Sequence, residues 1–197
     1  MNRRGTCSRK TEETDISVDL GLDGTGEYEI ETSIPFLDHM LCSFAKHGFF
    51  DLRIKARGDT QVDCHHTMED IGICLGKALQ KALGEKKGIR RFGEGSVPMI
   101  DALAFVSLDL SGRSHLKYGV RFPSPRVGEV EAELFEEFFR AFANHAGLDL
   151  HINLLYGSNV HHSVEAIFKA VARALDQACQ MDPRQTGVQS TKGSLDP

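Results

Sequence analysis

The residues best suited to chemistry lie in one short cluster, Asp63-Cys64-His65-His66-Thr67-Met68-Glu69-Asp70. The cluster opens an amphipathic segment whose apolar residues recur at helical spacing, which predicts a helix. On a helix, His65 and Glu69 lie one turn apart on the same face, a spacing that suits a divalent metal with nitrogen and oxygen ligands. Adjacent helical residues diverge by about 100°, so His65 and His66 cannot easily bind one ion together. The pair indicates two metal ions, or one ion and one structural histidine, unless both histidines are merely exposed or capping residues.

The same pattern occurs a second time, as Asn159-Val160-His161-His162-Ser163-Val164-Glu165-Ala166. Upstream of it, Phe142–Ala146 matches Phe44–Gly48, and Asp149–Ile152 matches Asp51–Ile54. Self-similarity at a fixed period predicts an internal duplication of two half-domains. Each half is expected to contain a helix, a strand, a loop and a His-His helix, and the second copy makes an accidental pair of histidines a much weaker explanation.

The composition of the chain excludes several classes of protein. It has 197 residues, of which 41% are hydrophobic, enough for one domain or two fused half-domains with an ordinary core. The net charge is −5, and Lys and Arg are scattered among acidic residues, which argues against nucleic-acid binding. No apolar run suits a membrane span or a signal peptide. Five cysteines without a CxxC pair favour a reduced, cytoplasmic setting, and Cys64 is either a soft metal ligand or a buried small residue.

Hydrophobic patterns predict further elements around the first cluster. Residues 1–10 are expected to be a flexible, basic N-terminus. Thr14–Leu20 and Tyr28–Ser33 each alternate in hydrophobicity and are separated by a glycine-containing turn, which predicts a β-hairpin. Pro35 is expected to begin a helix that carries His39.

The middle and the end of the chain carry candidate anion sites. Gly84–Gly95 is expected to be a glycine-rich basic loop whose arginines could hold an anionic group. Val97–Leu110 predicts one long strand or a pair of strands, and Glu129–Ala143 predicts a helix. In the tail, Ser190–Gly193 combines glycine, lysine and hydroxyls, which could cradle a phosphate unless the tail is disordered.

Together, these residues resemble the imidazoleglycerol-phosphate dehydratase family of histidine biosynthesis. The matching segments follow one another over nearly the whole chain beyond its first ten residues, so the resemblance is specific. They are Glu13-Thr14, Phe36–Leu41, Phe44–Gly48, the two His-His-x-x-Glu clusters, Ile89–Gly93, Asp109–Arg113, His162–Ala170 and Ser190–Gly193.

The resemblance implies an α+β fold made by internal duplication. Each half-domain is then a four-stranded sheet with helices on one face (ribosomal-protein-S5-domain-2-like), and the two helix layers face one another. The family also forms trimers that assemble into a shell of octahedral symmetry, so a homo-oligomer, a 24-mer built from trimers, is expected, with active sites between subunits. The implied divisions are a flexible N-terminus (1–10), a first half-domain (11–95), a second half-domain (96–182) and a C-terminal phosphate-contacting tail (183–197).

The activity implied by the resemblance is that of a hydro-lyase. It is the dehydration of imidazole glycerol phosphate to imidazole acetol phosphate at a di-manganese site, with two Mn²⁺ ions per active site. The proton to be removed is on a carbon with no adjacent carbonyl, so a metal that favours an imidazolate is useful. A carboxylate must serve as acid or base. The partner is a small-molecule substrate, with no nucleic acid and no membrane, and the candidate catalytic carboxylates are Glu13, Glu69 and Glu165.

The resemblance also assigns ligands and substrate contacts residue by residue. The metal ligands that it implies are His39, His65, His66, Glu69, His161, His162 and Glu165. The duplication suggests how they divide: His39, His66, His161 and Glu165 at one ion, and His65, Glu69, His162 and the counterpart of His39, which is Glu137, at the other. The substrate contacts are Glu13, Arg91, Arg113, Lys169, Ser190 and Lys192.

Glu137 is the position at which the chain departs from the family. It precedes His145 by the same interval by which His39 precedes His47, and the family has histidine there, in a Glu-His-Phe-Phe run. A glutamate oxygen suits manganese, but it adds charge and reach. The second ion is therefore expected to be retained with changed affinity or geometry, or to bind weakly. Alternatively, Glu137 is a solvated helix residue that forms an ion pair with Arg140.

Two functions therefore follow from the sequence. The first is an active manganese-dependent dehydratase. The second is a catalytically weak homologue that binds an imidazole phosphate without turnover. A metal-storage or structural shell protein is disfavoured, because it would leave Glu13, Arg91, Arg113 and Lys192 without a role.

Overall fold

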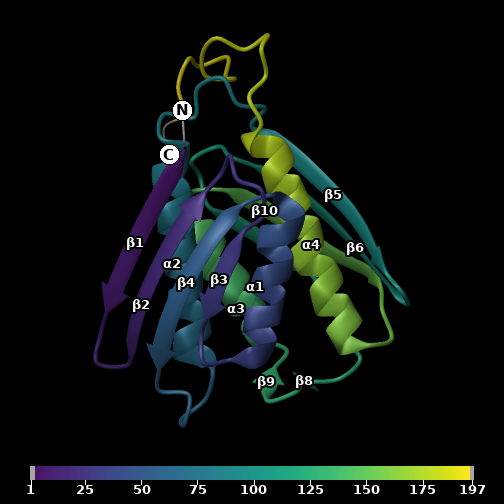
Figure 1. The fold of residues 1–197 in the computed structure, drawn as a ribbon. Helices are drawn as coiled ribbons and strands as arrows, with labels where there is room; N and C mark the ends of the chain where they lie inside the picture. Colours follow the sequence, from purple (N-terminus) through teal and green to yellow (C-terminus); the bar gives the residue numbers. More distant parts are fainter. Residues whose placement is uncertain (1–2, 196–197) are drawn as a thin grey trace.

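Two four-stranded sheets form the outer layers of the chain, and four helices fill the space between them (Figure 1). The structure is a computed structural model and describes residues 3–195. Helix α1 packs on α4, and α2 packs on α3, so the two helix layers face one another as expected. The helices are α1 (Pro35–Gly48), α2 (His65–Leu83), α3 (Leu134–Ala146) and α4 (Val160–Cys179).

The two sheets share one topology, which confirms the α+β class and agrees with the internal duplication. The strand order is β1-β2-β4-β3 in the first sheet and β5-β6-β10-β7 in the second. In both sheets the last strand of the order runs parallel to its neighbour and the other pairs are antiparallel. The strands are β1 (Arg4–Lys10), β2 (Thr14–Gly21), β3 (Tyr28–Glu31), β4 (Asp51–Gly58), β5 (Phe92–Met99), β6 (Ala102–Asp109), β7 (His115–Gly119) and β10 (Asp149–Tyr156), with a small ribbon of β8 (Arg126–Val127) and β9 (Val130–Glu131).

Local sequence explains where the helices with the candidate ligands begin. Pro35 lies in the first turn of α1, where its missing N–H would have no intrahelical partner. Asn159 caps α4, because its side-chain oxygen accepts a hydrogen bond from the backbone N–H of His162. The apolar face of each helix is buried between the layers, while the side chains of His39 and His161 near the helix starts stay partly exposed.

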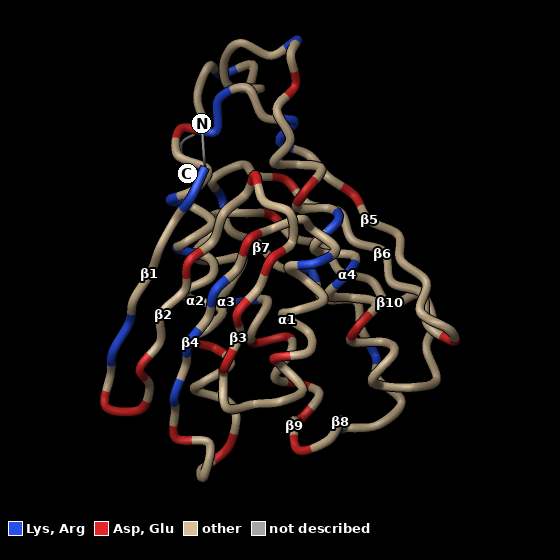
Figure 2. The backbone as a smooth tube through the Cα atoms, in the orientation of Figure 1, with Lys and Arg blue, Asp and Glu red and all other residues tan. Residues whose placement is uncertain are grey.

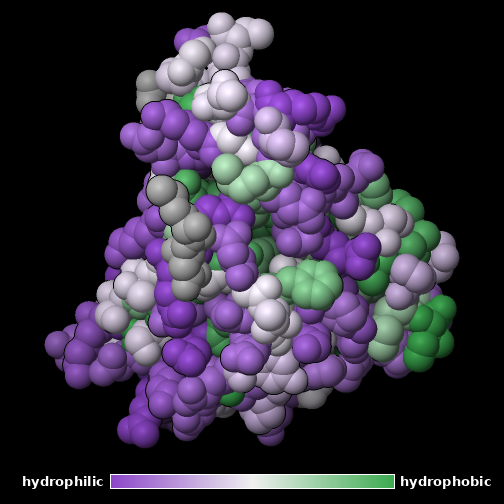
Figure 3. Space-filling model, turned by 45° about the horizontal axis from the view of Figure 1, so that its top comes forward, coloured by the Kyte–Doolittle hydropathy of each residue, from purple (hydrophilic) through white to green (hydrophobic). Residues whose placement is uncertain are grey.

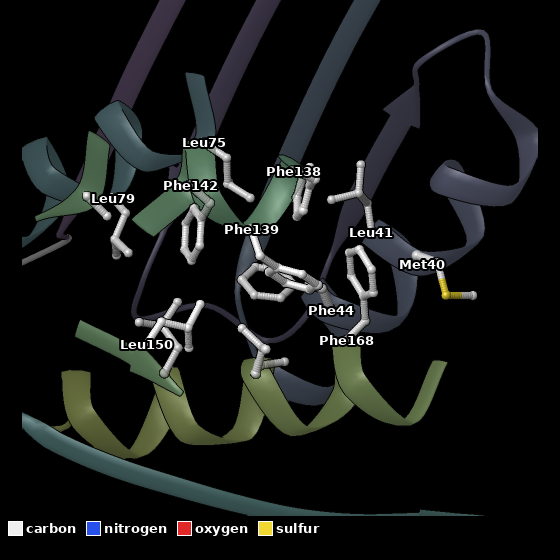
Figure 4. Close-up of a cluster of buried hydrophobic side chains, with 14 of the residues drawn as sticks. Met40, Leu41, Phe44, Leu75, Leu79, Phe138, Phe139, Phe142, Leu150 and Phe168 are labelled. Carbon is white, nitrogen blue, oxygen red and sulfur yellow. The ribbon is translucent and has the colours of Figure 1, made fainter. Parts of the chain in front are cut away.

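Phenylalanines of the second half form much of the core between the helix layers (Figure 4). Phe138, Phe139 and Phe142 of α3 are buried, and Phe168 of α4 packs against the first two with ring centroids 5.5 and 4.9 Å away. Each such aromatic pair contributes about 0.5–1.5 kcal/mol beyond its buried area. This packing fixes α4, and with it the histidines in its first turn.

One glycine in each half lets a strand approach the backbone of the helix that carries the histidine pair. A Cβ atom on Gly5 of β1 would lie 2.0 Å from the carbonyl oxygen of Ala78 in α2. A Cβ atom on Gly93 of β5 would lie 1.8 Å from the carbonyl oxygen of Ala174 in α4. Only glycine permits these contacts. Because the same contact occurs in both halves, the duplication is visible in the packing of strand on helix as well as in the sequence.

The structure corrects two expectations for the first sheet. The expectation of a flexible N-terminus is wrong for residues 4–10, which form β1 and pair with β2 along their whole length, while residues 1–2 lie outside the described part. The predicted hairpin of 14–20 with 28–33 is also wrong, because β2 pairs with β1 and β4, and β3 runs parallel to β4. The strand pattern of β1 is hard to recognise in the sequence, because the outer face is charged and the buried residues of the strand are only Gly5 and Cys7.

Element boundaries in the second half also differ from the sequence-based expectations. Strand β5 begins at Phe92 and belongs to the second sheet, so a division after residue 95 would cut through it. The 97–110 stretch falls in a pair of strands, with the turn at Ile100-Asp101. Helix α3 begins at Leu134 rather than Glu129, because Val130–Glu131 pairs as β9 in the small ribbon.

Over the described residues, segments with Lys and Arg are interspersed with segments with Asp and Glu (Figure 2). Among the described residues, no helix has both the length and the apolar character that a membrane span requires.

Candidate metal centre and phosphate pocket

Side chains from both halves meet where α1 packs on α4. The Oε2 atom of Glu165 lies 3.6 Å from Nε2 of His39 and 3.4 Å from Nε2 of His161. One ligand atom from each of the three residues lies within 4.8 Å of the others. His161 and Glu165 share a helix face at i and i+4, and the packing of α1 brings in His39. Two imidazole nitrogens and a carboxylate oxygen form a donor set that fits a divalent transition metal.

Glu165 is held as an anion although its side chain is buried. Nζ of Lys169 lies 2.6 Å from its Oε1 atom. Burial raises the pKa of Glu165, but the hydrogen bond from Lys169, with smaller effects of His39 and His161, outweighs burial, so the net pKa is lowered. A carboxylate that stays ionised is ready to bind a cation. Lys169, which the family resemblance makes a phosphate contact, therefore lies at the metal ligands and not in the pocket described below.

The first histidine pair has two different surroundings. His65 faces Glu69 on α2, with Nε2 and Oε2 3.8 Å apart. His66 turns its Nδ1 atom toward Asp59, 3.0 Å from Oδ2, and its Nε2 atom toward Glu13, 3.8 Å from Oε1. The hydrogen bond with Asp59 raises the pKa of His66. The structure therefore brings predicted ligands beside the predicted proton-transfer residue Glu13.

Cys64 does not lie in the described three-ligand groups. It occupies the N-cap position of α2, and its partly buried side chain packs against the core. Burial raises the pKa of the Cys64 thiol, which disfavours the thiolate that binds metals. Of the two roles open to this residue, the structure favours packing.

In the second histidine pair, His162 is oriented by an aspartate from the turn between two strands. Oδ1 of Asp101, between β5 and β6, lies 2.5 Å from Nδ1 of His162. The other oxygen of Asp101 accepts backbone hydrogen bonds from Ser158 at 2.9 Å and Asn159 at 2.8 Å. Hydrogen bonds from the Ser158 hydroxyl and from His162 hold the pKa of Asp101 well below its usual range.

Asp59 and Asp101 were not predicted from the sequence as site residues. Each lies against Nδ1 of the second histidine of a pair, which leaves Nε2 of that ring available for a metal. Asp59 precedes His66 by seven residues, whereas Asp101 and His162 are 61 residues apart. Asp101 and His162 come together only because the strands pair, so no local spacing in the sequence could reveal their contact.

A buried network holds the turn that carries Glu13. Asp70 of α2 accepts hydrogen bonds from Nε of Arg9 at 2.7 Å and from the hydroxyl of Thr14 at 2.5 Å. The hydroxyl of Thr11 in turn accepts from the backbone N–H of Glu13 at 3.1 Å. These bonds tie the β1–β2 turn to α2, so Glu13 is positioned by the same helix that carries His66.

Four of the predicted substrate-binding residues line one cavity of about 600 Å³. It lies between the loop that follows β6 and the C-terminal tail, and backbone bonds join the tail to the loop before β5 at the same end of the molecule (Figure 1). Arg91 is clamped by Asp109 through two bonds of 2.7 and 2.8 Å. Within residues 3–195, neither the Arg113 nor the Lys192 side chain forms a hydrogen bond or an ion pair. The four predicted residues in the lining are Arg91, Arg113, Ser190 and Lys192.

Glu137 and His162 lie outside the three-ligand groups of the described residues. Glu137 is part-exposed on α3, and its Oε2 atom is 3.7 Å from Nε of Arg140. Because α3 packs on α2 as α1 packs on α4, Glu137 takes the place on α3 that His39 takes on α1. His66 is also apart from the His39 group, so one chain does not assemble either predicted set of four ligands.

Comparisons with known proteins identify the family of the chain. The family model of imidazoleglycerol-phosphate dehydratase matches residues 32–175. The enzyme of that name from Geobacter metallireducens is 57% identical over 195 residues, 99% of this chain and 100% of the relative. The relative from Syntrophobacter fumaroxidans is 58% identical over 193 residues, 98% of each chain.

Solved structures of the same enzyme share the fold. The crystal structure from Staphylococcus aureus has a TM-score of 0.82 at 38% identity and covers 91% of this chain and 99% of its own. The crystal structure from Pyrococcus furiosus has a TM-score of 0.83 at 39% identity and covers 95% of this chain and 99% of its own. The chain belongs to the imidazoleglycerol-phosphate dehydratase family of hydro-lyases.

Proposed function

We propose that the chain removes water from imidazole glycerol phosphate to give imidazole acetol phosphate in histidine biosynthesis, using two manganese ions per active site. One observation carries the proposal. His39 of the first half meets His161 and Glu165 of the second in a compact donor group, and the duplication supplies a second group at His65 and Glu69. Carboxylate oxygens suit Mn²⁺, and imidazole nitrogens bind divalent transition metals.

The proposed ligands divide by the packing of the helices. His39, His66, His161 and Glu165 would hold one ion, and His65, Glu69, Glu137 and His162 the other. Such an ion would supply Lewis acidity at the imidazole ring of the substrate. Asp59 and Asp101 hold the Nδ1 atoms of His66 and His162, which would leave Nε2 of each ring to bind an ion.

The chain's own groups would bind the substrate and move its protons. Arg113 and Lys192 supply positive charge in the 600 Å³ cavity, and Ser190 adds a hydroxyl, a combination that fits a phosphate. Glu13, held by the Thr11 and Asp70 network, would transfer a proton. Glu69 and Glu165, as metal ligands, would be the other carboxylates near the substrate ring and would help to orient it.

We propose that neighbouring chains complete each site in a 24-mer built from trimers. Neither set of four ligands comes together among the described residues of one chain. A second subunit would therefore supply the ligands that each set lacks. The exposed apolar residues also support assembly: Ile100, Leu155 and Tyr156 lie at one end of the second sheet, and Figure 3 shows hydrophobic side chains gathered at the edge of the molecule near β5 and β6. All five cysteines are free, which suits the cytoplasm.

The test is an assay of imidazole glycerol phosphate with manganese, detecting the ketone product. We expect turnover by the parent protein and a loss of at least about 100-fold in kcat for Glu13→Gln, which keeps the shape but not the proton-accepting charge. Glu12→Gln, on the same turn, is the control and should behave like the parent. Binding of the substrate without turnover by the parent at any manganese concentration would instead support the catalytically weak homologue.

A further inference from the structure

A further group of side chains that could hold a metal ion lies on the second sheet, outside the proposed active site. It consists of His115 on β7 and of Asp149 and His151 on β10. One ligand atom from each of the three residues lies within 4.8 Å of the others. None of the three is among the ligands, phosphate contacts or supporting aspartates described above.

The sheet itself places these side chains together. His115 and Asp149 are register partners in the parallel pairing of β7 with β10. Asp149 and His151 are two residues apart on one strand, so both point to the same face of the sheet. Leu150, between them, points to the opposite face and is buried in the core. The donors therefore stand on a rigid platform rather than on a mobile loop.

The distances are close to those between ligands of a single ion. Nε2 of His151 lies 3.2 Å from Oδ1 of Asp149. Two ligands of a tetrahedral zinc ion, with bonds of about 2.0–2.1 Å, lie about 3.3–3.4 Å apart. The rings of His115 and His151 have their centroids 5.8 Å apart, so one imidazole can approach the ion from each strand.

An unsatisfied oxygen points to a missing partner at this place. Oδ1 of Asp149 is buried and forms no hydrogen bond with the described residues, because the nearby ring of His151 has the right distance without the right direction. A buried carboxylate oxygen without a donor costs free energy. A cation held by both imidazoles would satisfy it.

We propose that His115, Asp149 and His151 bind a late first-row divalent ion, with zinc as the ion of best fit. Two imidazole nitrogens and one carboxylate, with the outer side open to water, are the ligands of an open zinc site. Such donors bind zinc more tightly than manganese, so this site should fill with zinc when both ions are present. β7 is an edge strand of the sheet, so an ion bound by residues of both β7 and β10 would link this edge strand to its neighbour.

The test compares zinc binding by four untagged proteins. They are the parent, His115→Ala, His151→Ala and the control Lys117→Ala, which changes an exposed residue on the same face of β7. Each is dialysed against buffered free zinc with saturating manganese, and bound zinc is counted by elemental analysis. Zinc that enters the active site does so equally in all four, because its residues are unchanged.

We expect the parent and Lys117→Ala to bind about one more zinc per chain than either histidine variant at the same free zinc. The affinity of this site should fall at least about tenfold in His115→Ala and His151→Ala, while removal of the Lys117 charge should leave it equal or higher. Zinc should also raise the melting temperature of the parent more than that of the histidine variants. Equal zinc binding by all four proteins, or a loss in Lys117→Ala as well, would overturn the proposal.

Discussion

The second histidine of each pair differs from the first because an aspartate occupies one of its ring nitrogens. Asp59 lies against Nδ1 of His66, and Asp101 lies against Nδ1 of His162. The two aspartates come from different elements, one from the loop after β4 and the other from the turn before β6. The duplication has therefore kept the orientation of the ring while the residue that provides it has changed its origin.

Asp101→Asn tests this orientation and carries a pH signature. Because the pKa of Asp101 is lowered in the folded protein, its ionised form stabilises the fold at pH values above the unfolded-state pKa of about 3.9. This contribution is lost as the pH falls below the unfolded-state pKa toward the folded pKa. In metal-free protein, the variant should melt below the parent at pH 7, and the difference should narrow as the pH drops through 4. Thermal melts over pH 7 to 3 measure it, and a difference independent of pH would contradict this account.

Glu137 is the residue through which α3 of the second half would supply a metal ligand. If it does, Glu137→Ala removes a charged donor, and activity should need at least about tenfold more manganese, while Glu137→His restores the family's donor and should not. The Phe138 and Phe139 packing remains, so both variants should fold. The dependence of activity on manganese for the three proteins is the measurement.

The alternative for Glu137 is an ion pair with Arg140, whose Nε atom is 3.7 Å away. Arg140 also contacts Glu136 one turn earlier, so a part-exposed pair of this kind contributes little. On this account, three superimposable manganese curves are expected, and Glu137 is no ligand. Arg140→Ala is a useful control, since it removes the ion pair without touching the donor.

At the scale of elements, the sequence predicts the histidine helices better than the sheets around them. The helical period and the repeated His-His-x-x-Glu spacing are local, so α2 and α4 could be placed from sequence. The partners of β3, by contrast, depend on a parallel crossover through α1, and no local pattern records it. Strand β1 was hidden for another reason, since its buried positions include Gly5, which carries no apolar side chain to reveal them.

The same limit applies to the candidate site. His39, His161 and Glu165 were proposed as ligands from the family resemblance, and helix packing brings them together in the structure. The contact between Asp101 and His162 joins residues that are 61 positions apart, so no local spacing in the sequence indicates it. Burial of Glu165 beside Lys169 likewise depends on tertiary packing, so sequence could name these residues but not their protonation.

Gly5→Ala and Gly93→Ala should both destabilise the protein. Each added methyl group meets a helix carbonyl at 2.0 or 1.8 Å, and strand or helix must shift to accommodate it. Overpacking of this kind costs about 1–3 kcal/mol. Gly187→Ala is the matched control, because nothing lies within 4 Å of its Cβ position. Denaturant unfolding at one protein concentration measures all three, and equal midpoints would mean that the strands do not depend on this close approach.

At the scale of the whole molecule, metal and assembly are expected to be linked. If subunits share the ligand sets, each bound ion stabilises the assembled form by mass action. Complete removal of metal with a chelator should then give smaller species, of trimer size, and manganese should restore the large one. Size-exclusion chromatography with light scattering measures this. A control with chelator already saturated by manganese should remain large, and a shell unchanged after metal loss would contradict the shared ligands.

The packing of α1 on α4, and of α2 on α3, has a consequence for the origin of the chain. His39 belongs to one half, and His161 and Glu165 belong to the other, so a polypeptide of one half alone would hold an incomplete ligand group. Two such polypeptides related by a twofold axis would complete both groups at once. Joining two such copies in one chain would let each half change without the other, and His39 and Glu137 are equivalent positions at which the two halves of this chain differ.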